Sequence, residues 1–101
     1  MRVVFSRATK RDLREIGDHI SESSNEAANR FLDVLEARCL GLAKRPLRFR
    51  IVYSLDPPVR QAVEGRYRIF YSVREDHVLI ERILSSSRHI DEGVFGRCVS
   101  A

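Results

Sequence analysis

Three arginines and one histidine are the residues of this sequence best suited to chemistry. Arg68 and Arg82 lie in two runs rich in aromatic and β-branched residues, and Arg88 and His89 follow the second run. A guanidinium binds phosphate or carboxylate through two parallel hydrogen bonds. An imidazole gains and loses a proton near neutral pH, so His89 could act as a general acid or base, although a single histidine beside an arginine is more often an ordinary surface residue. We therefore expect these four residues to form a surface that binds a target.

The two runs that contain Arg68 and Arg82 predict a β-hairpin. The runs cover residues 67–73 and 78–84, and a polar connector, 74–77, lies between them. Because side chains alternate between the two faces of a strand, the odd-numbered residues of the first run share one face and Arg68 lies on the other. We expect the first face to be core and the second to be open. Each arginine is then either free for function or paired with a glutamate across the strands.

Two amphipathic helices precede the hairpin, over residues 9–20 and 25–43. Thr9 fits a helix cap, and Asp12 fits the first turn, where the helix dipole favours an anion. Pro46 ends the second helix. Apolar residues recur at helical spacing along both, and they include Leu13, Ile16, Ile20, Phe31 and Leu35. These residues belong in the core by default, but some could line a groove for a partner's helix, because a small domain rarely covers both faces of a helix.

The remaining segments complete a single α+β domain. Residues 3–5 and 59–63 predict short strands, whereas 47–58, with two consecutive prolines, predicts a loop over the sheet edge. The order strand, helix, helix and three strands predicts an antiparallel sheet covered on one face by a helical hairpin. We expect this domain to span residues 1–92 and residues 93–101 to form a C-terminal tail.

Composition limits the classes of function. The chain has 101 residues, 44% of them hydrophobic, and a formal net charge of +4. This charge indicates contact with nucleic acid or an acidic protein, or simply an ordinary basic domain. No run approaches the roughly 18 apolar residues of a membrane span. With no signal peptide, we expect a cytoplasmic protein in which Cys39 and Cys98 are reduced thiols. Their spacing is not that of a metal site, and we expect no metal and no cofactor.

Four stretches, taken in order, resemble a known family. They are DLREI at 12–16, AANRFL at 27–32, GRYRIFY at 65–71 and RIL at 82–84, followed by Arg88. They are similar to the ParE/RelE superfamily of toxins in bacterial toxin–antitoxin systems, and most similar to its ParE branch. The resemblance runs from about residue 3 to residue 91, nearly the whole chain.

The resemblance implies one of two activities. ParE-like toxins block DNA gyrase and stall it on cleaved DNA, whereas RelE-like toxins cut mRNA in the ribosome. RNA cleavage needs an acid, a base and cations at the phosphate. The lysine positions of RelE-like toxins fall on Val59 and Gln61, and their tyrosine position falls on or next to Val94, beside Phe95.

The resemblance therefore implies a gyrase inhibitor that binds its target through Arg68, Arg82, Arg88 and His89 and is not an enzyme. The alternatives are a ribosome-dependent endoribonuclease that uses Arg68, Arg88 and His89, and a non-toxic relic that only binds an antitoxin. Two positions depart from the ParE pattern, because Ser85 replaces a common histidine and His89 replaces a common acid.

The resemblance also implies a partner, a co-encoded ParD-like antitoxin whose C-terminal segment wraps the toxin. We expect that segment to be acidic and partly disordered, because the toxin is basic and folding on binding suits such a tail. The two chains would form a hetero-oligomer. The residues predicted to contact the antitoxin are Leu13, Ile16, Ile20, Phe31 and Leu35.

Overall fold

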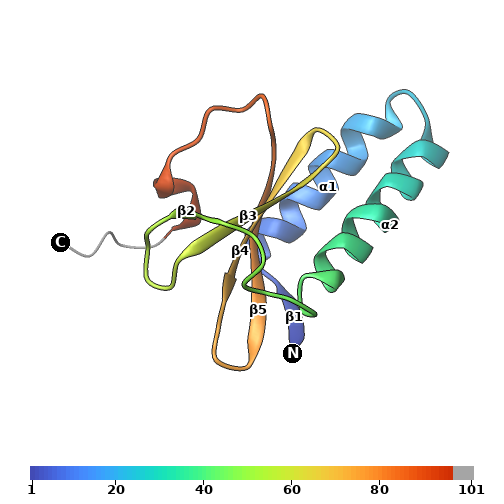
Figure 1. Ribbon diagram of the computed structural model, residues 1–101. Coiled ribbons are helices and arrows are strands. Elements are labelled where there is room, and N and C mark those ends of the chain that lie inside the picture. The colour runs from blue at the N-terminus through green and yellow to red at the C-terminus, as the bar shows by residue number, and fades with distance from the viewer. Residues whose placement is uncertain (97–101) are drawn as a thin grey trace.

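Two helices pack against one face of a five-stranded sheet in the computed structural model, which describes residues 1–96 (Figure 1). The predicted α+β class and the helical hairpin over one face are confirmed. In chain order the elements are β1 (Arg2–Phe5), α1 (Arg7–Ser21), α2 (Asn25–Gly41), β2 (Ile51–Tyr53), β3 (Val59–Glu64), β4 (Tyr67–Val73), β5 (His77–Ser85) and a short 3₁₀ helix, η1 (Glu92–Phe95).

The sheet has the strand order β1-β5-β4-β3-β2. Strands β3, β4 and β5 pair antiparallel in sequence, as predicted, and β2 adds antiparallel to β3. Strand β1 runs parallel to β5, so the sheet is mixed and not wholly antiparallel. Tight turns impose antiparallel pairing on consecutive strands. No tight turn connects β1 to β5, because both helices and three strands separate them in the chain. Their direction is therefore set by the tertiary arrangement alone.

Strand β2 lies in the segment predicted to be a loop. It has only three residues, and its pairing with β3 contains a register shift between Ile51 and Tyr53. Such a short, irregular edge strand has no clear alternation of apolar and polar residues, and two prolines follow it. The β4–β5 connector is also shorter than predicted, because His77 already belongs to β5.

Each face of the sheet carries its own apolar cluster. On the helix side, Ile69 and Tyr71 of β4 pack with Leu35 and Cys39 of α2, and all four are fully buried. On the other side, the fully buried Phe70 forms the centre of a second cluster. The prediction that this second face is open is therefore wrong at Phe70. Segments far along the chain cover it, and sequence alternation cannot reveal them.

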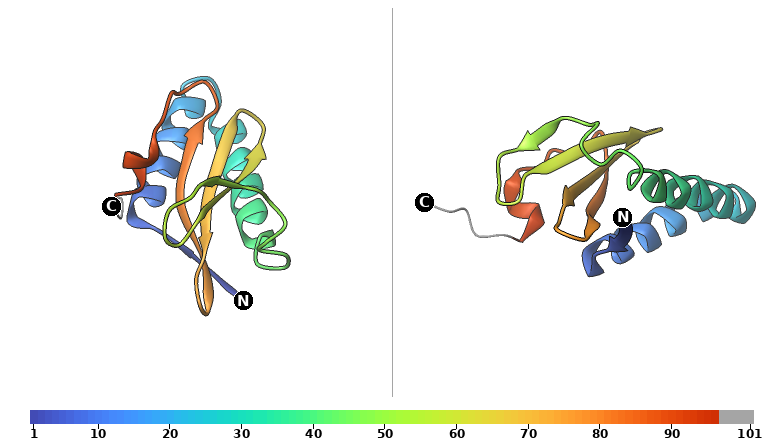
Figure 2. Two further views of the ribbon diagram at one scale, coloured as in Figure 1. Left: turned by 60° about the vertical axis from the view of Figure 1, so that its left-hand side comes forward. Right: turned by 60° about the horizontal axis from the view of Figure 1, so that its bottom comes forward.

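The covering segments are β2 and η1. The ring of Phe95 in η1 lies 5.4 Å from the rings of both Phe70 and Tyr53, and Val94 packs against the same cluster. In both views of Figure 2, η1 and α2 lie on opposite sides of the sheet. The predicted boundary between residues 92 and 93 falls inside η1, so the packed part of the chain extends through Phe95. The rest of the predicted tail, residues 97–101 with Cys98, lies outside the described residues.

Candidate functional site

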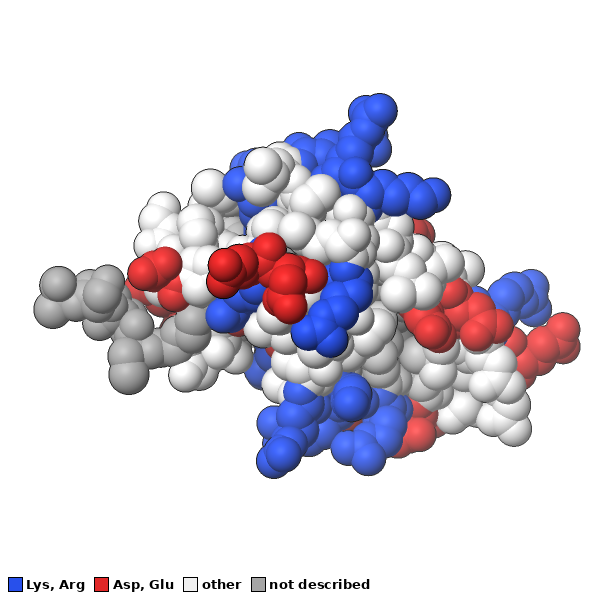
Figure 3. All heavy atoms as spheres, turned by 90° about the horizontal axis from the view of Figure 1, so that it is seen from below, with Lys and Arg blue, Asp and Glu red and all other residues white. Residues whose placement is uncertain are grey.

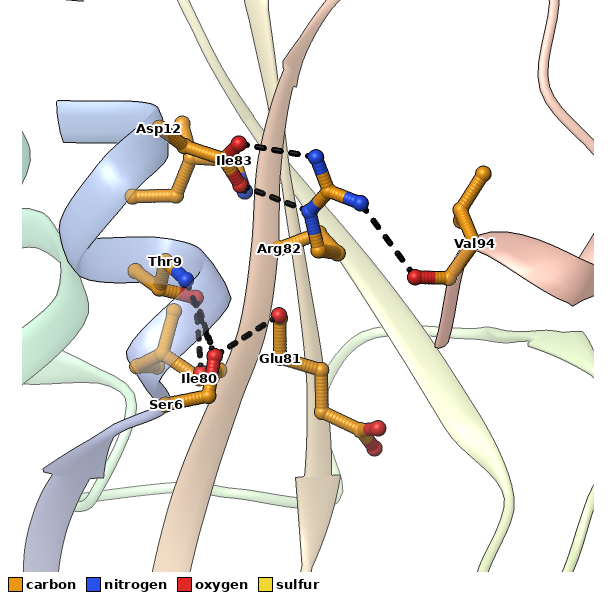
Figure 4. Close-up of polar contacts among 8 residues, drawn as sticks. All are labelled: Ser6, Thr9, Asp12, Ile80, Glu81, Arg82, Ile83 and Val94. Carbon is orange, nitrogen blue, oxygen red and sulfur yellow. Dashed lines mark hydrogen bonds and ion pairs between the residues drawn. The ribbon is translucent and has the colours of Figure 1, made fainter. Parts of the chain in front are cut away.

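A buried ion pair joins the first helix to the last strand. Asp12 on α1 accepts hydrogen bonds from Nε and Nη2 of Arg82 on β5, both at 2.8 Å, and from the backbone N–H of Ile83 at 3.0 Å (Figure 4). The Asp12 and Arg82 side chains are 5% and 18% exposed. Two parallel N–H···O bonds of this kind are the geometry in which guanidinium and carboxylate bind most strongly.

Arg82 also reaches the C-terminal segment. Its Nη1 donates to the carbonyl oxygen of Val94 at 3.3 Å, so one guanidinium connects α1, β5 and η1. The hydrogen bonds that Arg82 donates to Asp12 raise the pKa of Arg82, and burial opposes this shift. Arg82 was predicted to bind a target directly. The structure instead places its side chain in an internal network that positions η1.

Asp12 is the important residue that sequence reasoning placed wrongly. The helix begins at Arg7, so Asp12 lies in its second turn and not in its first, and its carboxylate faces β5. A signal for this was present in the sequence. Asp12 precedes Ile16 by four residues, and residues four apart lie on the same face of a helix, so a carboxylate on the buried face needed a partner.

The start of α1 is fixed to the same strand. Ser6, not Thr9, caps the helix, because its Oγ accepts the N–H of Thr9 at 3.0 Å. The Ser6 Oγ also lies 2.9 Å from the carbonyl oxygen of Glu81, and the buried Thr9 hydroxyl donates to the carbonyl oxygen of Ile80 at 2.8 Å. These bonds and the ion pair are drawn together in Figure 4. Together they fix the position of α1 on β5.

Arg68 lies on the sheet face away from the helices, as predicted. Its Nη2 donates to the carbonyl oxygens of Arg88, at 2.6 Å, and Ser85, at 3.2 Å. Its guanidinium carbon is 5.4 Å from the centroid of the Phe70 ring. The Nε atom is buried without a hydrogen-bond partner in residues 1–96. Arg68 therefore fixes the backbone that follows β5, with little of its guanidinium left for a ligand.

Arg88 and His89 are exposed on the segment between β5 and η1. Arg88 lines a cavity of about 170 Å³ together with Glu15 and His19 of α1. Over residues 1–96 no hydrogen bond or ion pair involves the His89 ring. The structure thus connects Arg68 to the backbone of Arg88, but it does not bring the side chains of Arg68, Arg88 and His89 together.

The five residues predicted to contact an antitoxin divide into two groups. Ile16 and Leu35 are 6% and 0% exposed and belong to the helix-side core, so a partner cannot reach them while the helices remain packed. Leu13, Ile20 and Phe31 are half-buried and keep part of their surface accessible. Helical spacing identifies an apolar stripe, but the centre and the edges of that stripe look alike in sequence.

A groove of about 500 Å³ follows the contact between α1 and α2. Its apolar lining includes Leu13 and Leu32, and its rim includes Arg14. A Cβ atom at Gly17 would lie 3.0 Å from Cδ1 of Leu32, so the two helices approach closely here. Leu13 and Leu32 also line an adjoining cavity of about 300 Å³, with Phe5. Of the accessible apolar residues, Leu13 therefore lies in the groove between the helices, whereas Ile20 and Phe31 line a separate cavity.

The part of the chain that the structure describes contains no group of three or more His, Cys, Asp or Glu residues that could bind a metal ion. Within the same part, no helix is both long and apolar enough to span a membrane. Burial raises the pKa of the Cys39 thiol to about 12, so Cys39 is a protonated core residue at neutral pH.

Comparison with known proteins agrees with this fold. The family model for the ParE toxin of the type II toxin–antitoxin system, parDE, matches residues 3–90. A solved structure described as the chromosomal ParDE TA system from P. aeruginosa superposes with a TM-score of 0.70 at 19% sequence identity, covering 84% of this chain and 95% of that one. No curated protein matches the chain. The fold and the family match define a toxin of a type II toxin–antitoxin system. The chain belongs to the ParE toxin family.

Proposed function

We propose that this toxin inhibits DNA gyrase by binding to it and cleaves no substrate itself. The proposal rests on one observation: apolar side chains occupy positions at which RelE-like toxins have proton-transfer groups. Val59 is fully buried in the second apolar cluster. Phe95 packs its ring against Phe70 in the same cluster. Neither side chain can transfer a proton, so the arrangement favours binding over acid–base catalysis.

The surface proposed to contact gyrase is segment 86–91, whose residues are exposed except for the half-buried Ile90. It presents the Arg88 and His89 side chains, and the bond from Arg68 to the Arg88 carbonyl oxygen fixes its backbone. A segment that is already ordered loses less conformational entropy when it binds. Arg82 contributes by positioning η1 next to this segment.

Supercoiling of relaxed plasmid by purified gyrase tests the proposal. We expect the toxin to inhibit supercoiling and to leave mRNA intact in a translation extract. The Arg88→Glu variant should inhibit at least about tenfold less, as expected when a fixed charge at an interface is reversed. Arg11→Glu, the same charge change on the exposed side of α1, is the matched control.

Two results would contradict this proposal. Supercoiling that is unaffected by excess toxin would rule out gyrase as the target. Cut mRNA in the extract, abolished by His89→Ala, would establish the endoribonuclease alternative instead.

We further propose that a ParD-like antitoxin occupies the groove between α1 and α2. The groove has an apolar lining with Leu13 and Leu32, which suits an amphipathic segment. Arg14 and Asp18 give the groove one charge of each sign, and an acidic side chain of the antitoxin would pair with Arg14. Ile20 and Phe31 line a separate cavity of about 340 Å³ next to Tyr67, where the antitoxin chain could continue. This assignment retains three of the five predicted contact residues and replaces Ile16 and Leu35 with Leu32.

Co-purification with the protein encoded by the adjacent reading frame tests the antitoxin proposal. Leu32→Ser and Arg14→Glu should each weaken the complex, and the second variant should fold normally because the Arg14 side chain is exposed. Val34→Ser, at an exposed position of α2 outside the groove, is the control. Equal recovery of all three variants would place the antitoxin elsewhere.

A further inference from the structure

A cluster of positive charge surrounds one aromatic ring at the C-terminal end of α2. Arg38, Lys44, Arg45 and Arg48 line a cavity of about 270 Å³ together with Phe49. The guanidinium carbons of Arg38 and Arg48 lie 5.2 and 5.5 Å from the centroid of the Phe49 ring. Four of the eight lining residues are cationic, and neither the gyrase surface nor the antitoxin groove proposed above includes any of them. We call this the basic pocket.

Two side chains of the sheet fix the backbone of the basic pocket. Nη1 of Arg60 on β3 donates to the carbonyl oxygens of Phe49, at 2.7 Å, and Leu47, at 3.3 Å. The hydroxyl of the buried Tyr71 donates to the carbonyl oxygen of Pro46 at 2.8 Å. The segment that carries Lys44, Arg45 and Arg48 is therefore ordered before any ligand binds, which lowers the entropy cost of binding.

The charge of the basic pocket is largely uncompensated. Within residues 1–96, Lys44, Arg45 and Arg48 form no ion pair, and Arg38 has Glu64 only at 3.9 Å. Like charges that line one pocket repel one another, so an anion bound in the basic pocket would relieve this repulsion.

We propose that the basic pocket binds the phosphate backbone of duplex DNA. Guanidinium groups bind phosphate oxygens in pairs, and several cations within one pocket match the closely spaced phosphates of a duplex. An acidic protein segment would also need apolar anchors. Of the apolar residues that line the basic pocket, Leu42 is only 3% exposed and the Phe49 ring lies under two guanidinium groups, so little apolar surface is accessible here. The choice of DNA among polyanions rests on the proposed function, because gyrase presents bound DNA to any protein that docks on it.

A second cationic group on the chain provides the matched control. Lys10, Arg11 and Arg14 on α1 are exposed like Lys44, Arg45 and Arg48, but they follow a helix surface and enclose no aromatic ring. Figure 3 shows that Lys and Arg side chains gather in separate places on one face of the molecule and not in a continuous band. The contribution of the basic pocket can thus be separated from that of net charge.

The experiment is fluorescence anisotropy of a labelled duplex of arbitrary sequence with the purified full chain, over a range of KCl concentrations. If about three phosphates are contacted, raising KCl fourfold should weaken binding about 40-fold. Replacing Lys44, Arg45 and Arg48 together with Gln should reduce the slope of log affinity against log salt by about 2.7. The triple Gln variant at Lys10, Arg11 and Arg14 should keep a slope close to that of the unchanged chain.

Several outcomes would overturn the inference. The first is that the unchanged chain does not bind the duplex, and the second is that both triple variants lose the same amount of salt dependence. The third is that poly-glutamate displaces the duplex at equal charge concentration, which would assign the basic pocket to an acidic protein. The supercoiling assay separates this inference from the proposed function. A chain that inhibits gyrase but does not bind duplex contradicts only the inference, and a chain that binds duplex but does not inhibit gyrase contradicts only the proposed function.

Discussion

Replacing Asp12 with Asn should destabilise the fold more than any change to a surface charge. The carboxylate accepts three hydrogen bonds, two from Arg82 and one from the backbone of Ile83. The amide is neutral and can accept only at its single oxygen, so the variant leaves a mostly buried guanidinium without a counter-charge. Removing one partner of a buried ion pair costs about 3–5 kcal/mol. For a domain of this size, a loss of 3 kcal/mol lowers the Tm by about 12–24 °C.

Urea denaturation followed by circular dichroism measures this loss of stability. Two further variants serve as controls. Glu26→Gln breaks the exposed pair between Glu26 and Arg30, whose side chains are 87% and 72% exposed, and should cost less than about 0.5 kcal/mol. The double variant Asp12→Leu with Arg82→Met removes both charges and should recover most of the stability that Asp12→Asn loses, because no unpaired charge then remains buried.

The pH dependence gives a further check on the same pair. The pKa of Arg82 is raised by its bond to Asp12, so the stabilising contribution of the guanidinium is complete below the ordinary pKa of arginine. Arg82 therefore cannot cause any change in stability between about pH 5 and pH 9. Asp12→Asn costing no more stability than Glu26→Gln, or a double variant less stable than the single one, would show that the ion pair does not stabilise the fold in this way.

Three other changes should have effects of predictable size. Thr9→Val removes the buried hydroxyl that donates to Ile80 and should cost about 1 kcal/mol by thermal denaturation, whereas Thr9→Ser should cost less because it keeps the donor. Burial raises the pKa of the Cys39 thiol from 9.0 to about 12, so the unfolded chain loses this proton first as pH rises, and stability should fall by about 1.4 kcal/mol between pH 8 and pH 10. Urea denaturation at the two pH values measures this fall in stability, which should be largely absent in Cys39→Ala. An equal fall in both proteins would contradict the prediction. Phe95→Ala removes ring contacts with Phe70 and should lower the free energy of unfolding, measured by urea denaturation, by about 2 kcal/mol. Phe95→Leu should lose about half as much, and no loss in either variant would mean that η1 does not stabilise the sheet.

The helices and the central hairpin could be predicted from the sequence because local patterns specify them. Helical spacing of apolar residues identified α1 and α2, and alternation along 67–73 assigned Tyr71 and Arg68 to opposite faces of β4, as the structure confirms. Strand β2 could not be predicted, because three residues at a sheet edge provide too little pattern. The same limit applies to η1, which forms only where Phe95 meets the ring of Phe70.

The predicted site residues show the same division. The arginines were correctly identified as the notable polar residues of the hairpin, but their roles depend on partners far away in the chain. Arg82 meets Asp12 across 70 positions, and Arg68 meets the carbonyl oxygen of Arg88 across 20. No local pattern encodes such pairs, so only the structure distinguishes an internal guanidinium from one that can bind a ligand.

Two amphipathic helices followed by an antiparallel ribbon are predictable from local sequence alone, because these elements depend on residues within a few positions of one another. The remaining features depend on the tertiary structure. It set the direction of β1, covered the second face of the sheet, and removed Ile16 and Leu35 from the accessible surface. It also gathered Arg38 and Arg48 around Phe49. Each of these depends on contacts between segments that meet only after the chain has folded, where burial and charge pairing determine the free energy.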